Sequence, residues 1–166
     1  MKSFFLFLIT LFITNILHAQ YQPKNISQQE VKKANDWVDK TYQSLSQDEK
    51  LGQLFIVALY TNKGETHIEE IRNIVSKDKI GGLILMQDDA AREINLVNEF
   101  QNKSKIPLMI GMDAEWGIFQ RIATAHKFPW AITFGAIQDK NLIYQIAQKI
   151  AEDCKRMGIN WDFAPV

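Results

Sequence analysis

Short apolar segments alternate along the chain with longer segments of helical periodicity. Three of the apolar segments are 55–59 (FIVAL), 80–86 (IGGLILM) and 108–112 (LMIGM), and a fourth, FAPV, stands at 163–166. Continuous apolar runs of this length are typical of parallel strands in a sheet that helices cover on both faces. The alternation therefore predicts an α/β fold in which three strand–helix units precede a fourth strand.

The segments between the apolar runs carry signals for the starts and ends of helices. Two patterns of the type Ser/Thr-x-x-Glu, at 46–49 and 66–69, predict capping boxes. The last helix is expected over 140–158, where apolar side chains recur every three or four residues and Gly158 supplies a stop signal. Cys154 lies on that apolar stripe, and we expect a buried structural thiol rather than a reactive one.

The number of predicted strands favours part of a barrel. Four strands with their helices make half of an eight-stranded barrel, whose usual length is about 250 residues. The alternative is a small open doubly wound sheet. No covering helix follows the fourth apolar run within the 166 residues. We therefore expect the first half of a TIM-type (β/α)8 barrel, with about four β/α units, in a chain that looks truncated.

The N-terminal residues have the pattern of a secretory signal peptide. Lys2 precedes the apolar run 4–17, and Ala19 offers a small residue at a cleavage position. This run is shorter than the roughly 20 residues that span a bilayer. We expect cleavage after Ala19, no stable membrane anchor afterwards, and a secreted or periplasmic protein. The predicted organisation is a signal peptide over 1–19, a leader and helix over 20–45, and one partial domain over 46–166.

The charge balance and the missing motifs argue against several classes of function. The 19 basic and 19 acidic side chains leave a formal net charge of zero, which gives no support for a nucleic-acid partner. The sequence contains no HExxH, CxxC, GxGxxG or GxSxG pattern, and its three histidines have no metal-ligand spacing. We therefore predict no metal ion and no other cofactor.

The segment 109–121 (MIGMDAEWGIFQR) ends a predicted strand in two carboxylates, a tryptophan and an arginine. In parallel α/β folds the chemistry takes place at the carboxyl ends of the strands. The connection from Asp113 to Gln138 is the longest in the chain, and long connections in compact domains are often functional. Carboxylates and arginine can hydrogen-bond sugar hydroxyls, and tryptophan can lie against a pyranose ring. The segment therefore predicts a sugar-binding site.

Each of these side chains also has a purely structural interpretation. Asp113 and Arg121 could form an ion pair that closes the loop, while Glu115 could pair with Arg121 or bind the loop backbone. Trp116 could pack in the core, and His126 could be an ordinary loop residue. The two nearby carboxylates, Asp113 and Glu115, would also fit the acid and nucleophile of a retaining glycosidase. The residues alone leave these alternatives open.

Several sequence blocks together resemble the N-terminal domain of glycoside hydrolase family 3, with the β-N-acetylhexosaminidase branch as the nearest match. In order along the chain they are LSQDEKLGQLF, IGGLILM, IPLMIGMDAEWG with the QR that follows, KFPW and RMGINWDFAPV. The resemblance implies a (β/α)8-type barrel and exo-acting hydrolysis of a β-linked amino-sugar glycan or small glycoside by retaining double displacement. The alternatives are a β-glucosidase-like or phosphorolytic member of the family, and a non-catalytic sugar-binding remnant.

The resemblance also implies roles for individual residues. Asp113 and Arg121 match the family residues that bind the terminal sugar, so Asp113 is not the expected nucleophile. The nucleophilic Asp and the His–Asp acid/base pair of the family lie on later strands and loops, and we expect no catalytic residue within this chain. Glu115, Trp116 and His126 are candidates for subsite or loop-support residues. Many members carry glycine where Trp116 stands, so we expect an altered subsite shape.

Overall fold

The computed structural model describes residues 26–164, so the signal peptide predicted over 1–19 lies outside the described residues. The chain divides into two units, Met1–Ser44 and Leu45–Val166. Helix α2 (Gln28–Gln43) belongs to the first unit. Its N-cap Ser27 and Glu30 form a reciprocal capping box, and none of its residues is buried. A local capping motif thus defines where this helix begins.

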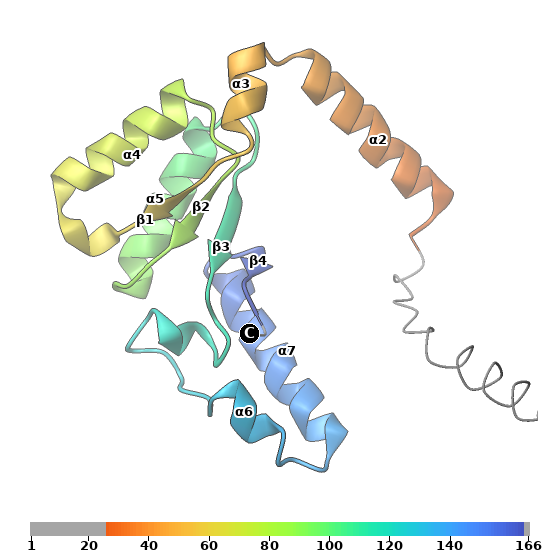
Figure 1. Ribbon diagram of the computed structural model, residues 1–166, viewed down its shortest axis with the longest axis vertical. Coiled ribbons are helices and arrows are strands. Elements are labelled where there is room, and N and C mark those ends of the chain that lie inside the picture. The colour runs from red at the N-terminus through yellow and green to blue at the C-terminus, as the bar shows by residue number, and fades with distance from the viewer. Residues whose placement is uncertain (1–25, 165–166) are drawn as a thin grey trace, which may run out of the picture. The chain divides into compact units, whose positions relative to one another are not determined.

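The second unit is built on one parallel sheet whose strands follow the order of the chain. Strands β1 (Ile56–Leu59), β2 (Gly82–Leu85), β3 (Met109–Met112) and β4 (Trp161–Asp162) are paired in the order β1-β2-β3-β4 (Figure 1). All three pairings are parallel. A doubly wound sheet would reverse its strand order at a switch point, whereas a (β/α)8 barrel adds each new strand beside the last. The predicted fold class, the first part of a TIM-type barrel, is therefore confirmed.

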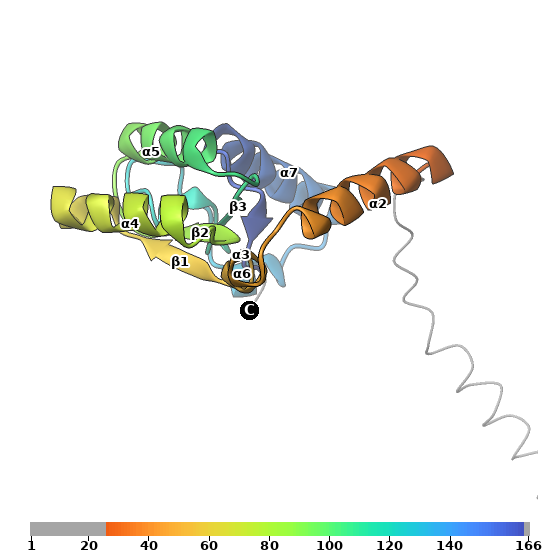
Figure 2. The ribbon, with the colours of Figure 1, turned by 90° about the horizontal axis from the view of Figure 1, so that it is seen from above.

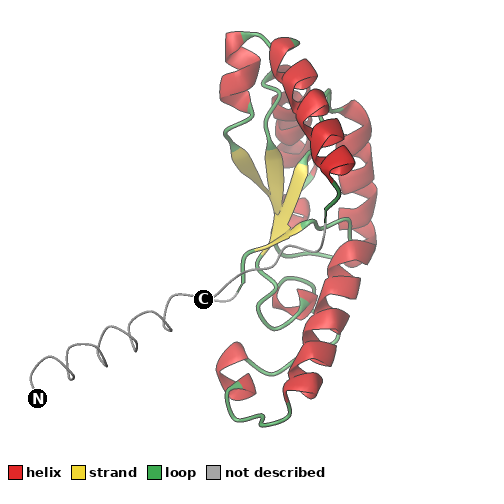
Figure 3. Cartoon of the chain, turned by 90° about the vertical axis from the view of Figure 1, so that its right-hand side faces the viewer, coloured by secondary structure: helices red, strands yellow, loops and turns green. Residues whose placement is uncertain are grey.

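Three long helices connect these strands and cover one face of the sheet. Helices α4 (Glu65–Lys77), α5 (Ala90–Lys103) and α7 (Lys140–Arg156) follow β1, β2 and β3 respectively. They lie along the same side of the strands (Figures 2 and 3). Two short helices, α3 (Gln47–Gly52) before β1 and α6 (Ala131–Phe134) before α7, complete the set of α-helices in the described residues. Parallel strands that are added in one direction, with the usual right-handed crossover, are expected to place their helices on one face of the sheet.

The hydrophobic core lies between the sheet and the three long helices. Burial of each large apolar side chain contributes about 1.5–3 kcal/mol to folding. The opposite face of the sheet still carries apolar side chains with substantial exposure, among them Ile56 and Met109, as is typical of residues that face the interior of a barrel. The largest fully buried apolar side chains are Phe100, Leu59, Ile71, Leu83, Leu85, Leu108, Ile110, Met112, Ile122 and Val75.

Two local predictions are wrong. Helix α4 begins at Glu65 after Gly64, whose φ of 86° turns the chain into the helix without any side-chain cap. Thr66 therefore already lies in the first turn and cannot act as an N-cap. The fourth strand, β4, ends at Asp162, which pairs with the last residue of β3, so Phe163 and Ala164 lie just beyond the strand, and residues 165–166 lie outside the described residues.

Other predicted helix signals are confirmed. Ser46 and Glu49 form the expected capping box at the start of α3. In addition to these predicted signals, Asp89 caps α5 by accepting hydrogen bonds from the backbone N–H groups of Ala91 and Arg92. Helix α7 ends shortly before Gly158, whose φ is 76°. A helix start needs a side-chain acceptor for its free N–H groups, and a helix end often needs a residue with positive φ. Ser, Asp and Gly, which meet these needs, can be recognised in the sequence.

One carboxyl group is buried in the core. Glu93, on α5, has no exposed surface, and neither of its carboxyl oxygens has a hydrogen-bond partner among the described residues. Burial raises the pKa of Glu93 to about 8, and the nearby carboxylates of Asp88 and Asp89 add to the effect. The carboxyl group therefore keeps its proton at neutral pH.

Replacing Gly82 with alanine is expected to lower the melting temperature by several degrees. A Cβ atom on Gly82 would lie 2.4 Å from the carbonyl oxygen of Met109, so β2 and β3 would have to separate where they are paired. Overpacking of this kind costs about 1–3 kcal/mol, and each kcal/mol lowers the melting temperature of a domain of this size by roughly 4 °C.

Gly135→Ala is the matched control, because the nearest atom to its new Cβ, the carbonyl oxygen of Ile132, would lie 3.2 Å away. This variant should lower the melting temperature less than Gly82→Ala does. Thermal melts followed by circular dichroism compare the two variants with the wild type. Indistinguishable melting temperatures for all three proteins would contradict the prediction.

Candidate functional site

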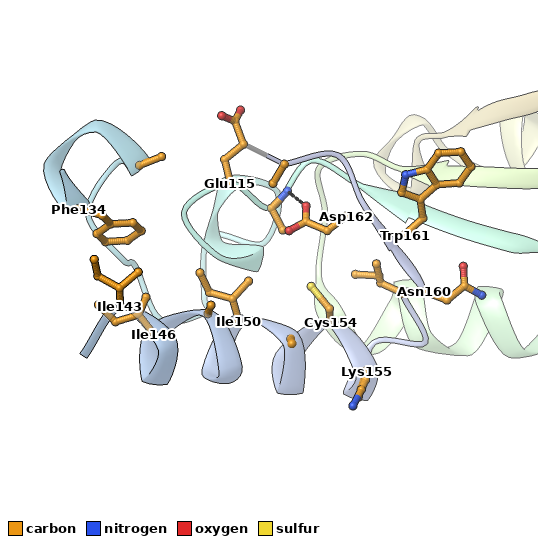
Figure 4. Close-up of a pocket in the computed structure, with 16 residues that line it drawn as sticks. Glu115, Phe134, Ile143, Ile146, Ile150, Cys154, Lys155, Asn160, Trp161 and Asp162 are labelled. Atoms are coloured by element: carbon orange, nitrogen blue, oxygen red, sulfur yellow. Dashed lines mark hydrogen bonds between the residues drawn. The ribbon is translucent and has the colours of Figure 1, made fainter. Parts of the chain in front are cut away.

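The carboxyl ends of β3 and β4 bring together polar residues from two distant segments. Asp113 directly follows β3, and Asp162 is the last residue of β4, where it pairs with Met112. The Oδ1 atom of Asp162 accepts a hydrogen bond of 2.9 Å from the backbone N–H of Ala114 (Figure 4). The start of the β3–α7 connection is therefore attached to the neighbouring strand.

Arg121 forms an ion pair with Asp113. Its Nη2 donates a hydrogen bond to Oδ2 of Asp113, and the side chains of Arg121 and Asp113 are 16% and 29% exposed. The Nε of Arg121 is buried and has no hydrogen-bond partner among the described residues. The structure thus brings together the two residues predicted to bind the terminal sugar, and it confirms the ion pair between them. Their role toward a sugar remains a prediction.

Backbone hydrogen bonds fold the first part of the connection back on itself. The short 3-10 helix η2 (Ile118–Gln120) follows Gly117, whose φ is 85°. The N–H of Gly117 donates to the carbonyl oxygen of Ala114 at 2.8 Å, and the N–H of Glu115 donates to Oε1 of Gln120 at 3.0 Å. This tight turn places Arg121 opposite Asp113.

Glu115 does not compete for Arg121, whose ion-pair partner in the described residues is Asp113. The carboxylate of Glu115 points away from α7, as Figure 4 shows. The hydrogen bond at this residue comes from its backbone N–H, with Gln120 as the acceptor. The pairing between Glu115 and Arg121, one of the alternatives raised by the sequence, is therefore wrong.

The aromatic residues of the connection pack against one another. The rings of Trp116 and Trp130 lie 5.9 Å apart between centroids at an interplanar angle of 33°. Trp116 is partly buried against the core, whereas Trp130 is 62% exposed. His126 contacts Phe128 edge to face, with ring centroids 4.6 Å apart. Trp116 and His126 therefore make packing contacts that support the folded connection.

Asp162 is the residue of this region that the sequence interpretation missed. Burial raises the pKa of its carboxyl group, and the nearby Asp113 and Glu115 add to the increase, while the hydrogen bond from Ala114 opposes it. The apolar run 163–166 places the predicted fourth strand after Asp162, so the sequence does not mark Asp162 as a strand end. The sequence offers a carboxylate between Ile-Asn-Trp and the apolar run 163–166, but its place at the end of β4 follows only from the structure.

An apolar pocket of about 670 Å³ lies beside these strand ends, between α6 and α7. Figure 4 shows Phe134, Ile146 and Ile150 on its walls. Asp113 and Arg121 are not among its lining residues. Cys154 lines the pocket, and its predicted burial is confirmed. Burial raises the pKa of this thiol to about 11, which disfavours the reactive thiolate.

Within residues 26–164, no group of three or more His, Cys, Asp or Glu side chains is placed to hold a metal ion. In the same part of the chain, no helix has both the length and the apolar character to cross a membrane.

Residues 46–166 match the family defined as the glycosyl hydrolase family 3 N-terminal domain. The chain belongs to glycoside hydrolase family 3. The match begins within two residues of Leu45, where the second unit of the structure begins. The family resemblance read from the sequence blocks is therefore confirmed.

The family 3 chain is similar to enzymes of known name. A β-N-acetylglucosaminidase/β-glucosidase of Cellulomonas fimi is 30% identical over 130 residues, which cover 78% of this chain and 22% of that protein. β-Hexosaminidase A of Pseudoalteromonas piscicida is 34% identical over 109 residues, which cover 58% of this chain and 18% of that protein. The chain thus spans about a fifth of the length of these two relatives.

The fold comparison agrees with the family assignment. A solved glycoside hydrolase family 3 β-N-acetylglucosaminidase from Paenibacillus sp. str. FPU-7 matches with a TM-score of 0.64 at 27% sequence identity. The match covers 74% of this chain and 24% of that one. The strand order and the covering helices described above are therefore those of the first part of a family 3 barrel.

Proposed function

We propose that this chain is part of a secreted or periplasmic, exo-acting β-N-acetylglucosaminidase that works by retaining double displacement. The observation that carries the proposal is the Asp113–Arg121 pair at the carboxyl end of β3 in a family 3 chain. Support for the amino sugar comes from two relatives whose names include β-N-acetylglucosaminidase or β-hexosaminidase. Support for export comes from the signal-peptide pattern over 1–19.

In this proposal Asp113 and Arg121 hold the terminal sugar of the substrate. The Asp113 carboxylate accepts hydrogen bonds from sugar hydroxyls, and the Arg121 guanidinium donates to sugar oxygens. A carboxylate that is already paired with a guanidinium is a weaker nucleophile than a free one, so this pair suits binding better than attack at the anomeric carbon. The nucleophile and the acid/base group are expected elsewhere in the complete protein.

β-Glucosidase activity is the second candidate. The Cellulomonas fimi relative carries both activities in its name, and the two substrates differ in the group at C2 of the sugar. The family resemblance implies a glycine in many members where Trp116 stands, so the ring of Trp116 is the feature of this chain that we expect to affect the choice of substrate.

The test is hydrolysis by the complete protein of two chromogenic substrates, p-nitrophenyl β-N-acetylglucosaminide and p-nitrophenyl β-glucoside. We expect faster release of p-nitrophenol from the amino-sugar substrate, with no requirement for inorganic phosphate. Faster release from the glucoside would support the second candidate, and strict dependence on phosphate would indicate phosphorolysis. No release from either substrate would contradict the proposal. Assaying culture medium, periplasm and cytoplasm separately tests export, and activity confined to the cytoplasm would contradict it.

A further inference from the structure

A single side-chain hydrogen bond connects β4 to the backbone next to Asp113. Oδ1 of Asp162 accepts it from the N–H of Ala114 at 2.9 Å. This N–H belongs to the peptide group that joins Asp113 to Ala114, so the bond restricts rotation about ψ of Asp113. The orientation of the Asp113 side chain at the strand end therefore depends on Asp162.

The other hydrogen bonds in this short segment are internal to it. The N–H of Gly117 donates to the carbonyl oxygen of Ala114 at 2.8 Å, and the N–H of Glu115 donates to the side chain of Gln120 at 3.0 Å. Arg121 pairs with Asp113 within the same connection. These contacts hold the turn together, but they do not fix the turn against the sheet. Beside the apolar packing of Ile118 and Ile122 in the core, the bond to Asp162 attaches the turn to the sheet, because Asp162 belongs to a neighbouring strand.

The backbone beside this bond supports the same geometry. Gly111 and Met112 of β3 are in register with Trp161 and Asp162 of β4, and the N–H of Phe163 donates to the carbonyl oxygen of Met112 at 3.0 Å. Hydrogen bonds of the β3–β4 ladder thus hold the backbone on both sides of Asp162. A residue that positions a functional group works best from a strand held in this way, because its own movement is small.

A carboxylate is also a demanding choice at this position. Asp162 is partly buried near Asp113 and Glu115, and both of these surroundings disfavour its charged form. An ionised carboxylate makes a stronger hydrogen bond to a backbone N–H than a neutral acceptor does. The strength of the bond to Ala114 offers a reason for a carboxylate to stand where the local electrostatics oppose it.

We propose that Asp162 is a positioning residue of the sugar site, which holds the Asp113–Ala114 peptide so that Asp113 and Arg121 are aligned toward the terminal sugar. The inference rests on the proposed sugar-binding role of Asp113. It adds a residue from a different strand that does not itself need to touch the substrate.

The kinetic test compares Asp162→Ala with Asp162→Asn in the complete protein. Alanine removes the acceptor, and we expect KM for the β-N-acetylglucosaminide to rise at least about tenfold. Asparagine keeps an oxygen that can accept the same hydrogen bond, so it should restore KM to within about threefold of the wild type. Glu152→Gln, a change on the exposed surface of α7, is the control and should leave KM unchanged.

Measuring KM separately from the fraction of active enzyme distinguishes a positioning role of Asp162 from a role in stability alone. If Asp162 only stabilised the fold, Asp162→Ala would lower the melting temperature and the fraction of active enzyme, and the remaining enzyme would have the wild-type KM. A wild-type KM in Asp162→Ala would therefore overturn the inference. Equal defects in the alanine and asparagine variants would overturn it as well, because the retained acceptor would then have no effect.

Hydrogen exchange keeps this test independent of the proposed function. If the wild-type protein cleaves no β-glycoside, the proposed function fails, and the inference is judged on the exchange rate of the Ala114 amide. We expect this amide to be protected in the wild type and in Asp162→Asn, and to exchange at least about tenfold faster in Asp162→Ala. An unprotected Ala114 amide in the wild type would overturn the inference, even if Asp162→Ala failed to fold.

Discussion

Replacing Asp113 with alanine in the complete protein is expected to lower kcat/KM for a β-N-acetylglucosaminide by roughly 30- to 1,000-fold. The variant loses the acceptor for the sugar hydroxyls, and it leaves the guanidinium of Arg121, only 16% exposed, without its charge partner. Loss of a hydrogen-bonded charge in a partly buried site costs on the order of 2–4 kcal/mol, and each 1.36 kcal/mol is about tenfold in rate. Steady-state kinetics measure the effect directly.

Controls for this prediction separate sugar binding from stability. Asp113→Asn keeps the size of the side chain and one acceptor oxygen, so it should lose less activity than Asp113→Ala. Arg121→Ala and the double variant complete a double-mutant cycle, and a coupling energy above about 0.5 kcal/mol would show that the pair acts together. Thermal melts of the same proteins report the structural contribution. An unchanged kcat/KM in Asp113→Ala would mean that the sugar is bound elsewhere.

Replacing Glu93 with glutamine is expected to make the protein more stable than the wild type at alkaline pH. Below pH 4.5, the ordinary pKa of an exposed glutamate, both folded and unfolded states bind the proton, and the carboxyl group has no pH-dependent effect on stability. Between pH 4.5 and about pH 8 the unfolded state ionises while the folded state keeps its proton. The wild type therefore loses stability as the pH rises through this interval, and above it the full cost is present.

The size of the effect follows from the same two pKa values. With a pKa of 4.5 in the unfolded state and about 8 in the folded state, the wild type should lose about 3–4 kcal/mol of its free energy of unfolding between pH 5 and pH 9. Glutamine cannot ionise, so this dependence should be absent in Glu93→Gln. Its unpaired amide costs about 1–3 kcal/mol at every pH, and at pH 5 the variant should be no more stable than the wild type. Urea unfolding at pH 5 and pH 9 measures both values.

Glu99 supplies a control on the same helix. Hydrogen bonds from Arg72 and Lys103 lower the pKa of Glu99 to about 2, so this group is ionised in both states between pH 5 and pH 9. The stability difference between Glu99→Gln and the wild type should therefore stay constant over this interval. If the difference for Glu93→Gln stayed equally constant, Glu93 would not be a buried neutral acid.

The sequence was sufficient to predict strands and helices whose signals are local. The apolar runs predicted β1, β2 and β3 to within a residue or two, because strands covered by helices need continuous apolar character. The position of β4 could not be predicted in this way, since FAPV is as apolar as a strand. β4 ends at the residue that pairs with the last residue of β3. The register between two strands cannot be read from the local sequence.

The same distinction applies to the site. Asp113 and Arg121 lie in one connection, so their pairing could be anticipated from a turn between them. Asp162 reaches Ala114 from another strand, and only the topology of the sheet brings the two together. The burial of Glu93 does have a signal in the sequence. Glu93 falls on the apolar helical stripe of Ala90, Val97 and Phe100, where a charged residue is unexpected.

The sequential strand order has a consequence for how the unit assembles during synthesis. One α-helix lies between β1 and β2 and one between β2 and β3, and the first of these connections also holds the short 3-10 helix η1 (Thr61–Lys63). The pairing of β3 with β4 must close over the longer segment that contains η2, α6 and α7. Contacts that are local in sequence form faster than those that close longer segments. The chain can therefore build its sheet strand by strand from the N-terminal side, and the loop that carries Asp113 and Arg121 acquires its bond to the sheet last.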